Sequence, residues 1–352
     1  MKAFKLKLQN LLWRMKSVSH HSFVKTEEFL TRHRLGFIVN WPHWLKAIFY
    51  LLPAMLMLLV FTFYPIINSF MISFYTGFNI QTGEFDNYTL LGNYIEVVNQ
   101  ANFLQALQNT AIIVFISVPI TILLSLFIAV ALNSIKPLKG FYQTIFFLPY
   151  VTNTIAIGLV FAFMFSGNTN TIANPVGLGL ANQVITWFGG QPIAWVATGA
   201  TYWSAMTVIL MYSVWNGLAF KIIVFLSGIQ GIDKQYYQAA QIDGASRAKA
   251  FSRITVPMIS PMIFYILITS VIGSFKTYSS VVAIIGVDGM ITTGSSGSLN
   301  MKTIVFYIYD YISLAAQDGL MSLAAAAAIV LFGIILVFTM IQLQVGKRRV
   351  HY

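Results

Sequence analysis

Six hydrophobic stretches, separated by polar segments, dominate the pattern of this chain. They cover approximately residues 46–71, 110–132, 144–165, 198–226, 258–278 and 320–343. A helix that crosses a bilayer needs about 20 mainly apolar residues, and each stretch meets that length. The pattern therefore predicts an all-α polytopic membrane protein with six transmembrane helices. Its membrane domain covers residues 46–345, between an N-terminal tail of residues 1–45 and a C-terminal tail of residues 346–352.

A polar segment, residues 231–261, interrupts this pattern between the fourth and fifth stretches. Asp233 is a favourable N-cap for a short helix over residues 234–242, because its carboxylate accepts hydrogen bonds from free backbone amides. Gly244 interrupts that helix, and Ser246 can cap a second one. The segment is predicted to form a helix, a glycine turn and a second helix. From composition alone, an ordinary amphipathic loop is an equal alternative.

The composition agrees with a membrane protein. Of the 352 residues, 57% are hydrophobic and 9% are charged, whereas soluble domains carry about 25% charged residues. The chain has no cysteine, which excludes disulfides, thiolate metal ligands and cysteine nucleophiles. The net charge of +11 could indicate a nucleic-acid partner. The basic residues are instead concentrated in segments on one side of the predicted membrane, so we expect no nucleic-acid partner.

The positions of the charges predict the orientation of the chain. Of the 21 basic residues, all except Lys276 and Lys302 lie in the N-terminal segment up to Lys46, the loop after the second stretch, residues 221–253 or the C-terminus. Lysine and arginine mark cytoplasmic loops, so both termini and the polar segment are predicted to be cytoplasmic. Lys221 is counted with that cytoplasmic segment. The opposite side carries Glu84, Asp86, Glu96, Asp288, Asp310 and Asp318.

The N-terminal tail has an amphipathic pattern. Apolar residues recur at helical spacing beside lysines and arginines, at Phe4, Leu8, Leu11, Leu12 and Met15. Such a helix is predicted to lie on anionic membrane lipid, and a partly disordered tail is the alternative. A secretory signal peptide would need an apolar run of about 7–15 residues after the basic start. The tail has none, so no signal peptide is predicted.

The order and spacing of residues in the polar segment resemble a cytoplasmic loop motif of permease subunits of binding-protein-dependent ABC importers. That motif begins Glu-Ala-Ala, continues Asp-Gly-Ala and ends Ile-x-Leu-Pro. The matching residues are Gln238, Ala239, Ala240, Asp243, Gly244, Ala245, Ile254 and Pro257. Gln238 replaces the glutamate of the motif, and Val256 replaces its leucine.

This resemblance implies that residues 227–257 couple the permease to a cytoplasmic ATPase dimer. Small residues at the turn would let the backbone of the partner approach closely. Asp243 and Arg247 would supply directional polar contacts. By the mechanism of the family, closure of the ATPases moves this loop and turns the pathway from inward-facing to outward-facing.

Segments outside the loop resemble the carbohydrate-type branch of the same importers. They are Gly92-Asn93-Tyr94, Ala106 to Thr110, Phe147 to Tyr150 and residues 319–326. The likeness is to maltose, multiple-sugar and glycerol-phosphate permeases. It implies a type I importer fold in a bacterial cell membrane and a second permease subunit that completes the translocation pathway. It also implies an extracytoplasmic binding protein that delivers a sugar or oligosaccharide.

Residues 279–319 are predicted to form a flexible outer loop, because residues 292–300 are rich in glycine, serine and asparagine. Three tyrosines follow this stretch at alternate positions, Tyr307, Tyr309 and Tyr311. Tyrosine is enriched where a membrane meets water. These three side chains are therefore expected at the membrane interface.

Catalytic and nucleotide-binding motifs are absent from the sequence. A phosphate-binding loop has the form GxxxxGK[ST], and the similar run at residues 273–277 lacks the glycine before its lysine. The histidines all lie in the tails, and no pair of carboxylates lies in a hydrophobic stretch. We therefore expect no catalytic residue, metal site or cofactor on this chain, and we expect ATP and magnesium to bind separate ATPase subunits.

Polar and aromatic residues within the hydrophobic stretches are candidates for substrate contact. Tyr212, Trp215 and Asn216 share one face of the fourth predicted helix, and Asn153 lies in the third. Aromatic rings can stack on the CH faces of a sugar, while an amide binds its hydroxyls. Packing within the protein is the alternative role for these side chains.

A second group of candidates lies near the outer end of the fifth stretch. A lysine within hydrocarbon costs about 3 kcal/mol and tends to face a cavity or a partner. Lys276 is that residue, and extension of its side chain to the interface is the alternative. The resemblance to maltose permeases implies that Ser274, Lys276 and Thr277 meet the substrate together.

Three rival functions stay open from the sequence. Within the family, an anionic polyol phosphate such as glycerol 3-phosphate would use Lys276 as its counter-charge. A membrane enzyme acting on lipid or sugar would need convergent acid and base residues, which the sequence lacks. An ion channel would leave the polar segment of residues 231–261 unexplained.

Overall fold

The computed structural model describes residues 41–135, 139–167, 178–293, 297–314 and 320–349. The amphipathic helix predicted in the first 40 residues lies outside this part of the chain. The structure divides into two units, Met1–Asn68 and Ser69–Tyr352, which are described separately.

The described part of the first unit is a run of helix. It comprises α2 (His43–Leu58), the π-helical turn η2 (Leu59–Phe63) and the start of α3 (Tyr64–Ser73). The continuous run His43–Ser73 has 31 residues and is long and apolar enough to cross a membrane. None of the side chains in α2 or η2 is buried. Exposure of a mainly apolar helix suits a lipid environment, where no water contacts the apolar side chains.

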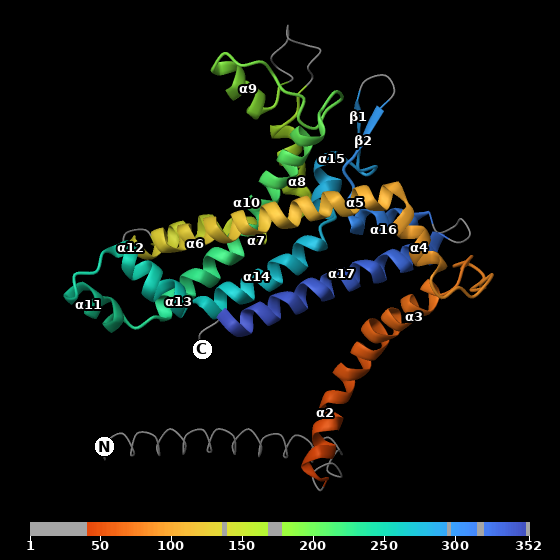
Figure 1. Ribbon diagram of the computed structural model, residues 1–352, viewed down its shortest axis with the longest axis horizontal. Helices are drawn as coiled ribbons and strands as arrows, with labels where there is room; N and C mark the ends of the chain where they lie inside the picture. The colour runs from red at the N-terminus through yellow and green to blue at the C-terminus, as the bar shows by residue number, and fades with distance from the viewer. Residues whose placement is uncertain (1–40, 136–138, 168–177, 294–296, 315–319, 350–352) are drawn as a thin grey trace, which may run out of the picture. The chain divides into compact units, whose positions relative to one another are not determined.

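Long helices form the body of the second unit (Figure 1). One rod is continuous through α5 (Ala101–Ile112), η3 (Ile113–Ser117) and α6 (Val118–Ser134). Against α6 pack α10 (Tyr202–Gly231) and α14 (Ser260–Phe275), and α14 also packs on α17 (Leu320–Arg349). Small side chains permit these close contacts: Ala129 of α6 and Ala326 and Ala327 of α17 are each 0% exposed.

Two of the six predicted spans are broken. The third consists of Gly140–Val151, within α7 (Lys139–Val151), and α8 (Thr154–Met164), which meet at 97°. Asn153 causes a new helix to begin, since its side-chain oxygen accepts hydrogen bonds from the amides of Ile155 and Ala156 at 2.9 and 3.1 Å. Pro149, just before the break, lacks an amide hydrogen.

The second break precedes the fifth predicted span. There Arg247–Met258 and Ser260–Phe275 meet at 66°. The first of these contains α12 (Arg247–Ala250), η5 (Phe251–Thr255) and α13 (Val256–Met258). Among the described residues, four helices are long and apolar enough to cross a membrane, or six if each bent pair is one span. Within the described residues, the six predicted spans thus correspond to four unbroken helices and two bent pairs.

The predicted flexible loop after α14 is wrong for the residues that the structure describes there. They form α15 (Ser279–Ile285), an antiparallel hairpin of β1 (Met290–Thr293) and β2 (Gly297–Asn300), and α16 (Ile304–Ser313). The all-α prediction thus missed a small hairpin. Its order comes from distant partners rather than from local propensity. Thr303, for example, caps α16 and also donates from its hydroxyl to the carbonyl of Thr277 at 2.5 Å.

The tyrosines of α16 make contacts within the protein, and their position at the membrane interface stays a prediction. Tyr307 is 3% exposed, and its hydroxyl donates to the side-chain oxygen of Gln100 at 2.5 Å. Tyr311 donates to the same oxygen at 2.6 Å. Tyr309 is 52% exposed and packs against the ring of Tyr278. Two of the three therefore hold α16 to the start of α5.

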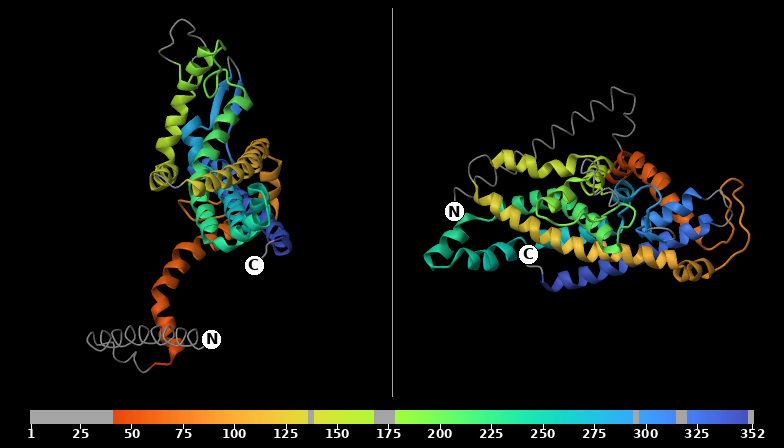
Figure 2. Two further views of the ribbon diagram at one scale, coloured as in Figure 1. Left: turned by 90° about the vertical axis from the view of Figure 1, so that its left-hand side faces the viewer. Right: turned by 90° about the horizontal axis from the view of Figure 1, so that it is seen from above.

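Two groups of elements occupy opposite ends of the long helices in the second unit (Figures 1 and 2). One end carries α4 (Gly92–Asn99), the hairpin and α16. The other end carries α11 (Lys234–Ile242), α12 and the C-terminal end of α17. At the top of the view in Figure 1, to the left of the hairpin, lies α9 (Leu180–Trp187). Within residues 92–94, the segment that resembles carbohydrate permeases, the side-chain amide of buried Asn93 donates to the carbonyls of Ser73 and Tyr75.

The side chain of Asn109 in α5 forms hydrogen bonds with β2 and α10. Its side-chain amide donates to the carbonyls of Asn300 and Lys302 at 2.9 Å each, and its oxygen accepts from the Tyr202 hydroxyl at 2.8 Å. The side chain is 0% exposed. Each of these groups would be left unsatisfied without it, and a buried unsatisfied polar group costs about 1–3 kcal/mol.

We therefore expect Asn109→Leu to destabilise the purified protein by about 3 kcal/mol, since three half-buried partners lose their bonds at once. The measurement is thermal unfolding in detergent. Gln108→Leu is the matched control, because Gln108 is exposed on the same helix and should unfold near the wild-type temperature. Equal unfolding temperatures for the two variants would contradict the role of Asn109.

Candidate functional site

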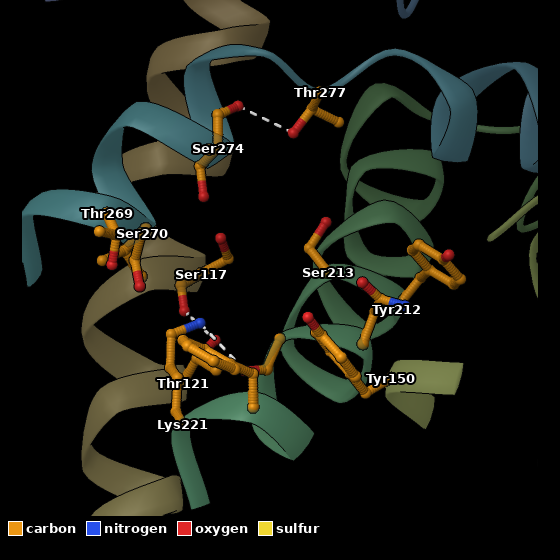
Figure 3. Close-up of a pocket in the computed structure, with 15 residues that line it drawn as sticks. Ser117, Thr121, Tyr150, Tyr212, Ser213, Lys221, Thr269, Ser270, Ser274 and Thr277 are labelled. Carbon is orange, nitrogen blue, oxygen red and sulfur yellow. Dashed lines mark hydrogen bonds between the residues drawn. The ribbon is translucent and has the colours of Figure 1, made fainter. Parts of the chain in front are cut away.

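A polar cavity of about 390 Å³ lies among α6, α10 and α14 (Figure 3). Its lining is Ser117, Val118, Thr121, Tyr150, Tyr212, Ser213, Asn216, Gly217, Phe220, Lys221, Thr269, Ser270, Gly273, Ser274 and Thr277. Such a concentration of polar side chains is unusual within membrane helices, where polar groups commonly mark the path of a substrate or ion.

Helical spacing brings these side chains to one space. On α10 the lining residues Ser213, Asn216, Gly217 and Phe220 recur at intervals of three and four, which places them on one face. The same intervals relate the lining residues from Ser270 to Thr277, on α14 and just beyond its end. The two polar faces are therefore opposed across the cavity.

Several hydroxyl groups of the cavity donate hydrogen bonds to carbonyls of their own helices. Ser213 donates to the Ile209 carbonyl at 2.7 Å, and Thr269 donates to the Tyr265 carbonyl at 2.8 Å. These bonds allow a hydroxyl to stay in an apolar environment without a partner on another helix. Each oxygen still has lone pairs that can accept from a ligand. The lining thus offers acceptors without first having to break contacts between helices.

Aromatic rings close one side of the cavity. Tyr150 of α7 stacks on Phe220 of α10, with ring centroids 5.8 Å apart. Tyr212 is 2% exposed, and its hydroxyl donates to the Thr154 carbonyl at 3.2 Å. Hydroxyls, an amide and aromatic faces around one space form a lining that suits a polyhydroxylated ligand.

A second feature, at the end of the bundle that carries α11, is the predicted helix, turn and helix. Asp233 caps α11, since its carboxylate accepts from the Gln235 amide at 3.0 Å. Gly244 has a φ of +69°, a backbone conformation that favours glycine. Ser246 caps α12 through the Lys249 amide at 3.3 Å. The predicted capping and the glycine break are confirmed.

The turn between α11 and α12 is open to solvent. Gln238, Ala239, Asp243, Gly244 and Arg247 are exposed, and Ala240 and Ala245 are half-buried. Ile242 is 87% exposed, a large apolar side chain at the tip. A hydrogen bond of 2.9 Å between the hydroxyls of Tyr237 and Thr255 holds the two helical arms together. The two helical arms are therefore joined by a hydrogen bond, and the turn between them presents an exposed apolar side chain.

Comparison with known proteins identifies the family. Residues 89–351 match the model of the binding-protein-dependent transport system inner membrane component. The chain belongs to this family of transport permeases.

Individual relatives cover most of this permease. The lactose transport system permease LacF of Rhizobium radiobacter is 31% identical over 301 residues, which are 84% of this chain and 92% of LacF. The arabinooligosaccharides permease AraP of Bacillus subtilis is 32% identical and covers 84% of this chain and 86% of its own. The sn-glycerol-3-phosphate permease UgpA of Agrobacterium fabrum is 26% identical, covering 87% and 97% respectively.

The fold is shared with a solved ABC transporter. A chain in the crystal structure of a bacterial alginate transporter, in complex with a periplasmic protein that holds an alginate pentasaccharide, superposes with a TM-score of 0.67. The match covers 92% of this permease and 97% of that chain at 20% identity. The predicted importer permease fold is confirmed by this likeness and by the family.

The cavity gathers four of the seven residues predicted for the substrate pathway of the permease: Tyr212, Asn216, Ser274 and Thr277. The other three lie elsewhere. Trp215 packs its ring against Phe161 of α8, at 5.7 Å between centroids. Asn153 caps α8, as described above. Lys276 is exposed at the C-terminal end of α14 and is not part of the lining.

Lys221 corrects one interpretation of the sequence. Counting Lys221 with the cytoplasmic charges leaves Lys276 as the candidate basic residue within the predicted spans. The structure places Lys221 ten positions before Gly231, the last residue of α10, and in the cavity lining. Helical spacing places Lys221 and Ser213 on the same face of α10 as Asn216 and Gly217. This spacing is the sequence signal for both residues.

No metal centre is evident in the part of the permease that the structure describes, where no three His, Cys, Asp or Glu side chains come together. The cavity lining likewise contains no carboxylate. Its chemistry, as the described residues present it, is recognition by hydrogen bonds, aromatic contact and one ammonium group.

Proposed function

We propose that this permease forms half of the translocation pathway of an ATP-driven importer for a sugar or oligosaccharide. The observation that carries the proposal is the cavity, in which hydroxyls of α6 and α14, the Asn216 amide and the Tyr150 and Phe220 rings surround one space. The relatives LacF and AraP, which are permeases for lactose and arabinooligosaccharides, support a carbohydrate. A membrane enzyme or a stand-alone channel does not account for the family membership.

Three kinds of partner belong to this proposal. A second permease subunit completes the pathway, and an extracytoplasmic binding protein delivers the substrate. A cytoplasmic ATPase dimer docks on the exposed turn at Gln238–Arg247 and binds ATP and magnesium, so this chain carries no cofactor. The loop of residues 227–257 is the coupling element within a membrane domain of residues 46–345, and tails of residues 1–45 and 346–352 flank that domain.

The orientation of the permease follows from the two ends of its helix bundle. The end with α11 and α12 carries Lys234, Arg247 and Lys249, and the opposite end carries Glu96 and Asp310. Because basic residues favour the cytoplasmic side, we propose that the coupling loop lies in the cytoplasm, together with both termini, whose sequences are also basic. The binding protein then meets the end that carries α4, the hairpin and α16.

The proposed function is tested by transport in proteoliposomes. The permease, assembled with its partner subunits and binding protein, should accumulate at least one of lactose, arabinotriose, maltotriose or digalacturonate when ATP is supplied to the ATPase side. The control lacks ATP. Accumulation of none of these sugars, with uptake of sn-glycerol 3-phosphate instead, would favour the anionic polyol phosphate; uptake of no solute would overturn the proposal.

We expect the isolated permease to hydrolyse no ATP above the background of an empty-vector preparation, since the sequence has no loop that cradles phosphates. Adding the ATPase subunits should restore hydrolysis. Stoichiometric turnover by the isolated chain, unchanged by further purification, would contradict a separate energy-supplying subunit.

Lys276→Met is expected to change substrate affinity by less than about threefold, because Lys276 is exposed and lies outside the cavity lining. An exposed ammonium group at a helix end is stabilised by water whether or not a substrate is bound. The measurement is the concentration for half-maximal uptake. A tenfold or larger loss confined to anionic solutes would instead make Lys276 their counter-charge.

A further inference from the structure

We propose that Lys221 makes this permease selective for a saccharide that bears an anionic group, a carboxylate or a phosphate, which pairs with the Lys221 ammonium inside the cavity. The inference rests on the proposed function and specifies its substrate class. It assigns the counter-charge to α10 rather than to Lys276.

The ammonium of Lys221 lies well inside the membrane domain. Ten residues separate it from the end of α10 at Gly231, which corresponds to about 15 Å along the helix. The side chain is half-buried and contributes to the cavity lining. A lysine at such a depth is costly unless it faces a cavity, an opposite charge or carbonyl groups.

The partners of this ammonium within the described chain are few. It donates one hydrogen bond, to the Gly217 carbonyl at 3.0 Å, and a lysine has three donors. None of the residues that line the cavity is an aspartate or a glutamate, and the described ion pair of the permease is Lys302 with Asp310, on the elements at the opposite end from α11. The positive charge of Lys221 is therefore not neutralised by any described residue of this chain.

The local structure keeps the ammonium in the cavity. Gly217 lies one turn before Lys221, and a Cβ built at Gly217 would come within 2.9 Å of the lysine nitrogen and 3.1 Å of a methyl carbon of Thr121. The missing side chain at Gly217 therefore makes the space in which the ammonium folds back along α10. Figure 3 shows the Lys221 nitrogen beside Thr121 and Ser117, with Ser213 and Ser274 around the same opening.

The surroundings of the ammonium favour an acidic saccharide over a simple anion. Within one cavity of about 390 Å³ the charge is joined by the Asn216 amide, several hydroxyls and the stacked pair Tyr150 and Phe220. A small inorganic ion would use the charge and leave the aromatic and hydroxyl groups unengaged. A sugar with a carboxylate or phosphate uses all of them, and a charge-assisted hydrogen bond is stronger than a neutral one.

The test compares matched neutral and acidic sugars on the purified complex of permease and ATPase subunits. Digalacturonate and galactobiose differ in a carboxylate or a hydroxymethyl group at each ring, and galactose 6-phosphate and galactose differ in a phosphate. Equilibrium binding is measured by titration calorimetry in detergent for the wild type and for Lys221→Met, Lys221→Arg and Lys276→Met. The carboxylate and phosphate pairs distinguish which anionic group is preferred.

We expect at least one acidic sugar to bind more tightly than its neutral counterpart, and Lys221→Met to weaken that acidic sugar about 10- to 100-fold. The same variant should change the neutral counterpart by less than about threefold. Lys221→Arg should retain part of the preference, because it keeps the positive charge. Lys276→Met, which removes a lysine outside the cavity, should bind both sugars as the wild type does.

Three results would overturn the inference. The first is the absence of any preference for the acidic sugars, including a failure of all four to bind. The second is an equal loss for acidic and neutral sugars in Lys221→Met. The third is release of the second permease subunit from that variant in size-exclusion chromatography, which would show that Lys221 pairs across the subunit interface. Sugar uptake retained by the wild type in any of these cases would leave the proposed function intact.

Discussion

Replacing Gly244 with leucine should abolish ATP-driven uptake while the permease stays folded in the membrane. Gly244 lies at the tip between α11 and α12, and a Cβ at this position would meet nothing within 4 Å in the described chain. A bulky side chain there has no clash within the permease itself. It would instead occupy the surface on which we place the ATPase dimer, so hydrolysis would no longer drive transport.

This substitution also strains the backbone, and matched variants separate that effect from a block of ATPase docking. Gly244 has a φ of +69°, where alanine and leucine are strained to a similar extent and asparagine is better tolerated. If docking is the cause, uptake should fall by about 90% or more in Gly244→Leu and much less in Gly244→Ala and Gly244→Asn. Equal losses in the leucine and alanine variants would assign the defect to the backbone.

A further control is Gly231→Leu, at the end of α10, where a Cβ also meets nothing within 4 Å. This variant adds the same side chain within the coupling loop but away from its tip, and we expect uptake close to the wild type. The measurements are ATP-driven uptake and ATP hydrolysis by the reconstituted complex. Normal uptake in Gly244→Leu would refute the coupling role of this turn.

Filling the cavity should be as damaging as blocking the turn. Gly273 of α14 lines the cavity and is exposed, and a Cβ there would meet nothing within 4 Å. Gly273→Trp therefore places the largest side chain in a space of about 390 Å³ without a clash at its attachment point. We expect uptake of every sugar to fall about tenfold or more, because the indole occupies the volume that the substrate needs.

Two variants show whether that loss comes from the cavity. Gly273→Ala leaves the space nearly unchanged and removes a glycine from a helix, which favours the helix by about 1 kcal/mol, so uptake should persist. Gly333→Trp adds an indole to α17 at a site outside the cavity lining where a Cβ also meets nothing within 4 Å. Loss of uptake in Gly333→Trp equal to that in Gly273→Trp would show a general effect of tryptophan on the bundle.

The sequence predicted the coupling loop more completely than the cavity. At the coupling loop, the caps Asp233 and Ser246 and the break at Gly244 were all predicted, because capping and a positive φ depend on residues that are neighbours in sequence. At the cavity, four of the predicted residues were brought together, while Lys221 was assigned to the wrong environment. The depth of a lysine depends on where its helix ends, and boundaries are less certain than the existence of a helix.

Interactions between distant segments account for the remaining errors. Trp215 shares a helical face with Asn216, yet its ring meets Phe161 of α8, a neighbour that periodicity along α10 does not reveal. The segment after α14 is rich in loop-forming residues, but the carbonyls of Asn300 and Lys302 are bound by Asn109. Such bonds join residues nearly 200 positions apart and order a segment whose local composition favours flexibility.

Local sequence patterns were sufficient to predict the class of the protein, its apolar helices and the capped turn between α11 and α12. Hydrophobic length, charge distribution and capping are local properties, and bilayer thickness and free backbone amides act on them directly. The packing of the helices, in contrast, sets which polar faces share the cavity, that Asn153 begins a second helix at 97° to the first, and that Lys221 lies among hydroxyls. These features depend on how helices pack in three dimensions, since a side chain's neighbours across a bundle are set by helix rotation and bending rather than by its own position in the chain.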